Sequence, residues 1–337
     1  DTLILYSGTY NEAINITDKS LVIASLFIRD RDINTISKTI IDGTGITDYF
    51  LKSTNWNERD IKIYGITVQN FQNQISPEYI SLKIYNSVFK SNGGSDYFIN
   101  TYRPIEIKNC EFNSNTKIED NFFEKCDGET EIISIKSCQN IVRNNLFKEC
   151  QGAVVLRHGN YNIIANNVFL GNDKKGTGGV RVINKGQIVV NNFFYKCKGV
   201  DFRSPLSIMN GVPNSPANRY VGVSDAVIAN NSFYDCAPIS FCEGKSEERS
   251  LQPKNVQFIN NLFYTKSDTT IYHVYDDISG IQVSNNLISK EVTKQLMNGF
   301  TKANIEIEQT GRVSIPKAIS KGTHLVSDSI KNILTTA

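Results

Sequence analysis

The stretch that decides the fold is Asn144-Asn145-Leu146-Phe147, because closely related tetrapeptides recur along the chain. Most copies have two asparagines, one further residue and a phenylalanine. The copies are Asp120–Phe123, Asn144–Phe147, Asn166–Phe169, Asn191–Phe194, Asn230–Phe233, Asn260–Phe263 and Asn285–Ile288. Successive second asparagines are 24, 22, 25, 39, 30 and 25 residues apart. A period of this size is typical of a solenoid, in which each repeat stacks on the next.

The residue types around the repeat predict strands rather than helices. The sequence has 42 Ile against 16 Leu, and β-branched residues favour extended structure. Asparagine tolerates the left-handed backbone region at sharp bends, and stacked asparagines can hydrogen-bond from one coil to the next. The phenylalanine two places later would stack inside the coil. We therefore predict an all-β fold, a right-handed parallel β-helix with 22–25 residues in an ordinary coil.

The spacing of the repeat also predicts the organisation of the chain. The weaker segments Lys62–Val68 and Ser81–Phe89 follow the same pattern, so we expect a single β-helix domain over residues 1–337. The coils of residues 95–265 carry the regular repeat and the candidate site. The two long spacings predict loops around residues 203–224 and 242–254, and loops inserted on one side of a solenoid commonly build its binding face.

Composition excludes several classes of protein. The chain is 40% hydrophobic, which is enough for a large core, and its net charge is +2. No apolar run approaches the ~18 residues of a membrane span, so we expect no membrane association. Proteins that bind nucleic acid usually carry a large basic excess, so we expect no nucleic-acid partner either.

The seven cysteines show no spacing typical of zinc ligands. Four of them, each five residues after a repeat asparagine, are predicted to form a buried stack of small side chains, with a disulfide or redox role as the alternative. These four are Cys126, Cys150, Cys197 and Cys236.

Three cations recur at nearly the period of the solenoid. Lys136 and Arg157 are 21 residues apart, and Arg157 and Arg181 are 24 apart, so they should lie on neighbouring strands with a spacing of ~4.8 Å. Stacked like charges are unfavourable. Glu129 and Glu131 could neutralise them as a solvated charge ladder. Alternatively, the cations and a metal held by the carboxylates form a site for acidic sugars or phosphates. His158 by itself is more often a structural hydrogen-bonding residue than a catalyst.

Several segments taken together resemble polysaccharide lyase family six, which contains alginate lyases and chondroitinase B on a right-handed parallel β-helix. The resemblance is dense between residues 116 and 263. The segments that carry it are Gly128–Ser137, Leu156–Asn160, Gly178–Val182 and Met209–Gly211.

The resemblance implies a catalytic and a metal set. Lys136 resembles the family's Brønsted base and Arg157 its general acid. Glu129 and Glu131 resemble two ligands of a calcium ion (Ca²⁺), and Asn100 fits the third. The strand after Asn100 reads Ile-Glu-Ile-Lys at residues 105–108, where the family usually has Ile-Arg-Ile-Gly.

The resemblance further implies that His158, Arg181 and Arg203 contact the substrate. The Gly-Gly-x-Arg-Val form around Arg181 is similar to the alginate branch of the family. The expected substrate is therefore an acidic polysaccharide, alginate above all, and the expected location is secreted or periplasmic.

The implied chemistry is β-elimination, which removes the C5 hydrogen of a uronate. Calcium prefers oxygen ligands and would stabilise the enolate-like intermediate. Lys136 must be uncharged to accept the proton, and Arg157 would donate a proton or stabilise charge at O4.

Three other functions stay open from the sequence. One is a dermatan-sulfate-type lyase. The second is a non-catalytic β-helix that binds carbohydrate or acts as an adhesin. The third is a glycoside hydrolase, whose carboxylates would have to include Asp276 and Asp277, the only adjacent pair of aspartates.

Overall fold

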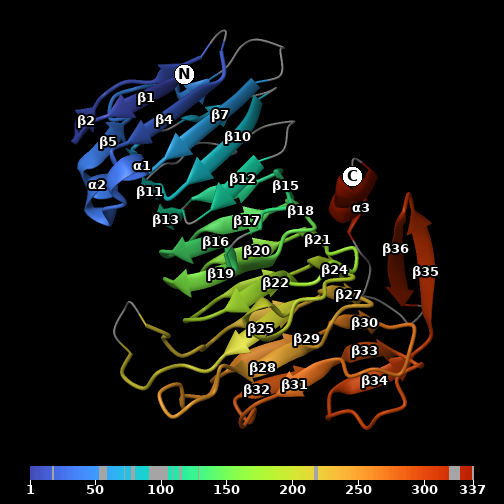
Figure 1. Cartoon of the computed structure of the whole chain (residues 1–337). Helices are drawn as coiled ribbons and strands as arrows, with labels where there is room; N and C mark the ends of the chain where they lie inside the picture. The colour runs from blue at the N-terminus through green and yellow to red at the C-terminus, as the bar shows by residue number, and fades with distance from the viewer. Residues whose placement is uncertain are drawn as a thin grey trace.

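The computed structural model describes residues 1–16, 19–52, 59–71, 73–76, 80–90, 105–108, 110–113, 116–127, 129–215, 219–318 and 327–335. The chain is wound into a parallel β-helix whose coils contribute to three long parallel sheets, and Figure 1 shows the coils stacked from the N-terminal end downward. The prediction of a parallel β-helix is confirmed.

The strands of the three sheets follow the chain coil by coil. The first sheet contains, in order, β1 (Thr2–Leu5), β4 (Leu21–Ser25), β7 (Arg59–Tyr64), β10 (Ile80–Tyr85), β12 (Ile105–Lys108), β15 (Phe122–Glu124), β18 (Leu146–Lys148), β21 (Val168–Leu170), β24 (Phe193–Tyr195), β27 (Ser232–Tyr234), β30 (Leu262–Tyr264), β33 (Asn286–Ser289) and β34 (Phe300–Ala303). The second contains β2 (Gly8–Tyr10), β5 (Thr39–Asp42), β8 (Thr67–Gln69), β11 (Val88–Lys90), β13 (Glu111–Asn113), β16 (Glu131–Lys136), β19 (Gly152–His158), β22 (Thr177–Val182), β25 (Leu206–Met209), β28 (Ile239–Glu243) and β31 (Tyr272–Val274). The third contains β14 (Lys117–Glu119), β17 (Ile141–Arg143), β20 (Ile163–Ala165), β23 (Ile188–Val190), β26 (Val227–Ala229), β29 (Val256–Ile259) and β32 (Ile281–Ser284). A small sheet near the N-terminus contains β3 (Ile14–Asn15), β6 (Tyr49–Lys52) and β9 (Asn73–Ser76).

The second asparagines of the repeat form a continuous ladder inside the coils. In each step, the side-chain Nδ2 and the backbone N–H of one asparagine both donate to Oδ1 of the asparagine in the next coil, at 2.9–3.0 Å. All members are buried. The ladder fixes both the register and the spacing of the coils. Its members are Asn121, Asn145, Asn167, Asn192, Asn231, Asn261 and Asn286.

The first residue of each repeat has a different structural role from the second asparagine. These residues have φ between 53° and 57°, a left-handed conformation that asparagine and aspartate tolerate better than most residues. They therefore make the bend, while the second asparagine makes the coil-to-coil bonds. The residues concerned are Asp120, Asn144, Asn166, Asn191, Asn230, Asn260 and Asn285.

The repeat phenylalanines stack inside the coils, as the spacing predicted. Neighbouring rings lie 4.6–4.8 Å apart and within 9° of parallel. They belong to a single apolar core that runs from Ile16 to Val292. The stacked rings are those of Phe123, Phe147, Phe169, Phe194, Phe233 and Phe263.

A second polar ladder was not predicted from the sequence. Its residues each precede a strand of the third sheet: the backbone N–H of Thr116 donates to Asn140 Oδ1, Asn140 donates to Asn162 Oδ1, and Asn162 donates to Gln187 Oε1, at 2.9–3.2 Å. The sequence pattern hides this ladder because its members differ in type.

The predicted cysteine stack is present. Cys126, Cys150 and Cys197 are buried and Cys236 is partly buried, and all seven cysteines of the chain are free thiols. Burial raises the pKa of the Cys150 and Cys197 thiols well above the usual value, so they stay protonated and unreactive.

The two predicted long loops are present, with one shift in position. Between β28 and β29 the loop spans residues 244–255, close to the prediction. The other runs from 210 to 226 rather than from 203, because the 3₁₀-helix η1 (Asp201–Arg203) and β25 occupy residues 201–209. Both loops lie at the edge of the second sheet.

Three helices and a hairpin depart from the simple solenoid. Helices α1 (Phe27–Asp30) and α2 (Ile33–Lys38) lie between β4 and β5. The antiparallel hairpin β35 (Ile305–Thr310) and β36 (Val313–Ala318), with α3 (Asp328–Thr335), packs on the outside of the first sheet. Figure 1 shows this C-terminal part on the side opposite α1 and α2. Residues 305–318 and 328–335 are therefore not coils, whereas the sequence prediction took the whole chain as β-helix. The prediction of a single domain stays a prediction.

None of the helices in the described part of the chain is long and apolar enough to cross a membrane.

The ladder gives a direct stability prediction within one repeat. Asn231→Ala removes an amide that donates to Val189 O and Asn261 Oδ1 and accepts two hydrogen bonds from Asn192. Because buried partners lose their bonds, we expect the free energy of unfolding to fall by about 3 kcal/mol. The measurement is urea unfolding followed by circular dichroism.

The neighbouring residue is the matched control. Asn230 is exposed and has φ 56°, which glycine adopts without strain. Asn230→Gly should leave the unfolding midpoint close to that of the wild type. Equal losses of stability in the two variants would contradict the division of tasks between the two asparagines.

Candidate functional site

The predicted cations lie on adjacent strands of the second sheet, but they do not form one row. Lys136, exposed at the end of β16, is aligned with His158 at the end of β19, and Val155 of β19 is aligned with Arg181 of β22. The alignment shifts by one residue between Ser134 and Lys136. This bulge brings His158, rather than Arg157, opposite Lys136, which the sequence spacing could not show.

Arg181 is fixed and neutralised. Its side chain is 2% exposed, its Nη1 lies 3.2 Å from Glu131 Oε1, and its Nε and Nη2 donate to the carbonyl oxygen of Phe202 at 3.1 and 2.7 Å. Burial lowers the pKa of Arg181, and the charge of Glu131 opposes that effect. Glu131 therefore neutralises one cation, as the charge-ladder interpretation expected, but it does so for Arg181 alone.

Arg157 has a hydrogen-bond donor with no protein partner. Its guanidinium lies 4.2 Å from the centre of the Tyr220 ring, an arrangement that holds the charged plane in place. Its Nη1 is buried and makes no hydrogen bond with any described residue. A buried donor without a partner is costly, so this group is prepared to bind an oxygen atom of a ligand.

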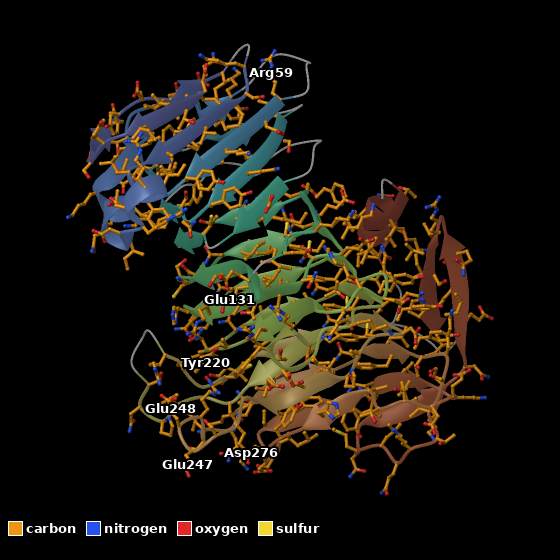
Figure 2. The ribbon with its side chains drawn as sticks, in the orientation of Figure 1. Arg59, Glu131, Tyr220, Glu247, Glu248 and Asp276 are labelled. Atoms are coloured by element: carbon orange, nitrogen blue, oxygen red, sulfur yellow. The ribbon has the colours of Figure 1, made fainter. Side chains whose placement is uncertain are left out.

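Tyr220 is held above the sheet by the contact between the two long loops. The loops pair through backbone hydrogen bonds of 2.8 and 2.9 Å between Gly211 and Leu251, and Arg219 forms an ion pair with Glu248. The guanidinium of Arg249 also lies 5.2 Å from the Tyr220 ring. Figure 2 shows Tyr220 and Glu248 on the same side of the molecule as Glu131.

Sequence reasoning missed Tyr220 and Arg249. The repeat spacings predicted where the two long loops lie, but no motif showed which of their residues would reach the sheet. Phe202, which contacts both Arg181 and Arg249, was missed for the same reason.

His158 is a partly buried imidazole between cations. Burial, followed by the charges of Arg157 and Lys136, lowers its pKa below the usual 6.5. The imidazole is therefore neutral at pH 7. Its Nδ1 is buried without a hydrogen bond to the described residues, so it can act as an uncharged donor or acceptor toward a ligand.

Arg203, the third predicted substrate contact, ends the short helix η1, which packs against β22 and β25. Its Nε is buried and makes no hydrogen bond within the described part of the chain. It resembles Arg157 in this respect.

Two of the three predicted calcium ligands, Glu129 and Glu131, are among the residues that the structure describes. Glu129 is exposed just before β16, and Glu131 is the first residue of that strand. Two carboxylates two residues apart supply oxygen donors of the kind calcium prefers, although Oε1 of Glu131 also faces Arg181. Asn100 lies outside the described residues. Among the residues described, no group of three or more His, Cys, Asp or Glu side chains could hold a metal ion.

The aspartates that a hydrolase would need hold the loops instead. Asp276 accepts hydrogen bonds from Lys245, and from Asn210 at 2.8 Å. The Lys245 bond, above all, lowers the pKa of Asp276 far below its usual value, so it cannot donate a proton. Asp277 accepts hydrogen bonds from Ser279 within a turn. The geometry does not support acid–base hydrolysis by this pair.

The stacked coils and the long parallel sheets define a class, that of parallel β-helix proteins. A family model described as Chondroitinase B matches residues 49–333. The chain therefore belongs to the chondroitinase B family, polysaccharide lyase family six.

Solved structures agree with this membership. The PL6 family alginate lyase AlyGC has 26% sequence identity and a TM-score of 0.60 over 95% of this chain. This chain spans 53% of AlyGC, about half its length. No curated protein sequence matches the chain.

Two further structures share the fold. A mannuronic acid specific family 6 lyase from human gut microbiota is 21% identical, with a TM-score of 0.52 over 90% of this chain and 85% of its own. Alginate lyase AlyF-OU02 is 15% identical, with a TM-score of 0.54 over 96% of this chain and 86% of its own.

The state of His158 can be tested by titration. Its lowered pKa means that the unfolded chain binds a proton more readily than the folded chain. Stability is therefore fully present above pH 6.5 and is lost as the pH falls below it. We expect the His158 ring proton in NMR spectra to titrate with a midpoint below 6.5, its resonance being assigned by its loss in His158→Gln. A midpoint above 6.5 would contradict the described environment.

Proposed function

We propose that this protein is a polysaccharide lyase that cleaves alginate, an acidic uronate polymer, by calcium-assisted β-elimination. The observation that carries the proposal is the unpaired, buried Nη1 of Arg157 beside the exposed amine of Lys136 on the next strand. The proposed base and the proposed anion-binding donor thus come from neighbouring strands of one sheet, and removal of a proton next to a carboxylate uses both.

Lys136 acts as the base. Its Nζ takes the proton from C5 of the uronate, and the electron pair left on C5 forms the C4–C5 double bond as the C4–O4 bond breaks. Lys136 suits this role because its side chain is exposed and, among the residues described, makes no hydrogen bond or ion pair. Its amine is therefore available to the substrate.

Arg157 acts at the leaving oxygen. Its free Nη1 donates a hydrogen bond to O4 as negative charge develops there. The final proton on O4 comes from this guanidinium or from water. Tyr220 is a positioning residue, because its ring fixes the plane of the guanidinium.

Three polar groups bind and orient the chain of sugars. His158, Arg181 and Arg203 are the proposed contacts. Arg181 acts mainly through position, because three of its five N–H donors already bond to Glu131 and Phe202. His158 and Arg203 each keep a buried nitrogen for the ligand.

A calcium ion is part of the proposal, with Glu129, Glu131 and Asn100 as its ligands. When bound, the ion would neutralise the uronate carboxylate and so make the C5 proton more acidic. The support is the chemistry of the two carboxylates beside the base. Because Glu131 Oε1 also faces Arg181, the ion and Arg181 would share this carboxylate.

Alginate is proposed over dermatan sulfate on two grounds. The structural relatives are described as alginate lyases, and the Gly178–Val182 segment has the form typical of the alginate branch. A polymer of this kind lies outside the cell that degrades it, so we propose a secreted or periplasmic protein.

Substitution of Lys136 tests the proposed base. Lys136→Ala should remove elimination activity altogether, and Lys136→Arg should do the same, since arginine keeps the charge but does not give up its proton. The measurement is the ultraviolet absorbance of the unsaturated uronate product, with polymannuronate, polyguluronate and dermatan sulfate as substrates.

Lys302→Ala is the control, because Lys302 is exposed on β34, far along the chain from the site. Unchanged circular dichroism would show that the variants fold. Product formed by Lys136→Ala at the wild-type rate would eliminate the proposed base. Absence of product from every polymer with the wild-type protein would favour the non-catalytic alternative.

Calcium dependence is a separate prediction. Chelation should lower activity by at least tenfold, and added calcium should restore it, because the ion stabilises charge in the transition state. Glu129→Gln should weaken calcium binding in a direct titration. Full activity after exhaustive chelation would show that Glu129 and Glu131 serve only as counter-charges.

A further inference from the structure

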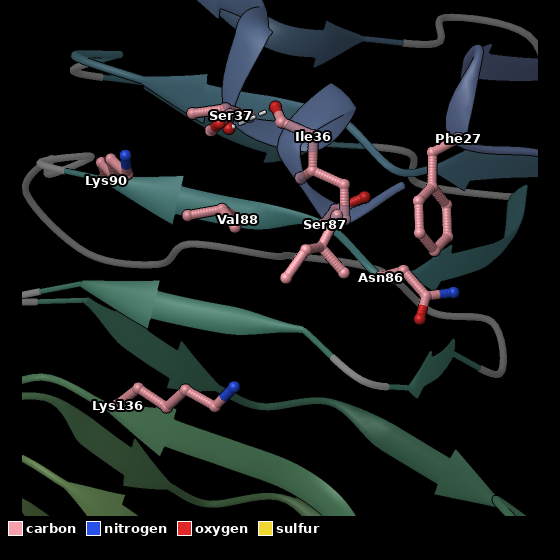
Figure 3. Close-up of a pocket in the computed structure, with 10 residues that line it drawn as sticks. Phe27, Ile36, Ser37, Asn86, Ser87, Val88, Lys90 and Lys136 are labelled. Atoms are coloured by element: carbon pink, nitrogen blue, oxygen red, sulfur yellow. Dashed lines mark hydrogen bonds between the residues drawn. The ribbon is translucent and has the colours of Figure 1, made fainter. Parts of the chain in front are cut away.

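A cavity of about 350 Å³ opens beside Lys136 on the N-terminal side of the site. Helix α2 provides Ile33 and Ile36 on one wall, and β11 provides Val88 and Lys90 on the other. Figure 3 shows Ile36, Val88 and Lys90 in the upper part of the view, with Lys136 below them on β16. Its volume is at the lower end of the ~300–1,000 Å³ typical of pockets for small ligands.

The cavity continues the row of the proposed base. Phe89 of β11 and Ile135 of β16 are both aligned with Phe112 of β13. The residues that follow them, Lys90 and Lys136, therefore occupy equivalent positions two strands apart, or ~9.6 Å at the usual strand spacing. A linear chain laid along this row would pass both amines.

Lys90 lies half-buried on the wall of the cavity. Among the described residues, its amine makes no hydrogen bond or ion pair, and the same holds for the side-chain amide of Asn86, which also lines the cavity. Two unused polar groups beside an apolar wall suit a sugar, whose ring has an apolar C–H face and polar substituents.

The charge in this row changes sign two strands beyond Lys90. Gln69 of β8 is aligned with Lys90, and Asp42 of β5 is aligned with Gln69. Hydrogen bonds from Thr44 and Gln69 lower the pKa of Asp42 to about 2, so this carboxylate is charged at pH 7. An anionic chain would be attracted by Lys90 and repelled by Asp42, two strands further along the sheet.

We propose that this cavity is the terminal sugar subsite on the N-terminal side of Lys136, in which Lys90 pairs with a uronate carboxylate and Asp42 prevents the chain from extending further. The inference rests on the proposed function, since it places the same acidic polysaccharide along the same sheet. Helix α2 forms a wall of the cavity and so closes the N-terminal end of the proposed sugar-binding surface.

Direct binding tests the subsite without relying on turnover. Reduced, saturated oligouronates of increasing length are titrated calorimetrically into the wild-type protein and into Lys90→Gln. We expect affinity to fall about five- to tenfold in the variant, because one charge-assisted contact is lost. In the elimination assay, KM should rise by the same factor with kcat unchanged.

A second pair of variants tests the wall that α2 forms, and comparing the two with each other controls for effects on folding. Ile33 is 73% exposed, so both Ile33→Asp and Ile33→Lys should fold. The aspartate should weaken binding of the anionic chain and the lysine should not. Lys302→Gln, on distant β34, should match the wild type.

The outcomes separate this inference from the proposed function. Elimination with wild-type KM in Lys90→Gln, together with equal binding by the two Ile33 variants, would overturn the subsite alone. Binding that depends on Lys90, but without any elimination product, would support the subsite and overturn the lyase proposal. No binding of any oligouronate by the wild-type protein would overturn both.

Discussion

The rest of the structure depends on the amide ladder formed by the second asparagine of each repeat. A parallel β-helix must bend its chain sharply in every coil, and each bend leaves backbone groups that cannot pair within their own strands. The ladder satisfies many of them, because from Asn145 onward each asparagine oxygen accepts two hydrogen bonds from the coil before it. The stacked phenylalanines and cysteines then occupy positions that the ladder has already aligned.

The site inherits this alignment. Lys136, His158 and Arg181 come from three successive coils, so their relative positions are fixed by the stacking of backbone rather than by any loop. What the loops add is different in kind: Tyr220 and Arg249 close over Arg157 from one end, while α2 bounds the other end beside Lys90. A sheet held in register by its coils is thus combined with loops at one end and a helix at the other.

Much of the fold could be predicted because it repeats. The asparagine pairs and phenylalanines identified the parallel β-helix, the interior stack and the two long coils. They did so because equivalent positions in successive coils carry the same residue types, and the repeat is therefore visible in the sequence. Helices α1 and α2 and the hairpin β35–β36 were missed because each occurs once and has no repeat to reveal it. The second ladder escaped notice because threonine, asparagine and glutamine share its positions.

The site was predictable to a similar extent. Spacing placed Lys136, Arg157 and Arg181 on neighbouring strands, and the family resemblance supplied their proposed roles. The sequence spacing could not show the bulge that puts His158 opposite Lys136. It also could not show that Glu131 forms its ion pair with Arg181. Such choices depend on side-chain reach and burial. Residues in the loops, such as Tyr220, depend on a tertiary contact between two segments that no local pattern describes.

The C-terminal hairpin and helix have a consequence for how the molecule unfolds. In a plain solenoid each coil touches only its neighbours, so coils can separate one at a time. Here Ile315 of β36 and Leu334 of α3 share an apolar cluster with Leu146 of β18 and Tyr234 of β27, which belong to different coils. A segment that packs on several coils from outside couples the unfolding of those coils. The coils that carry the site should therefore open as one cooperative unit, while the N-terminal coils, which this segment does not reach, can fray independently.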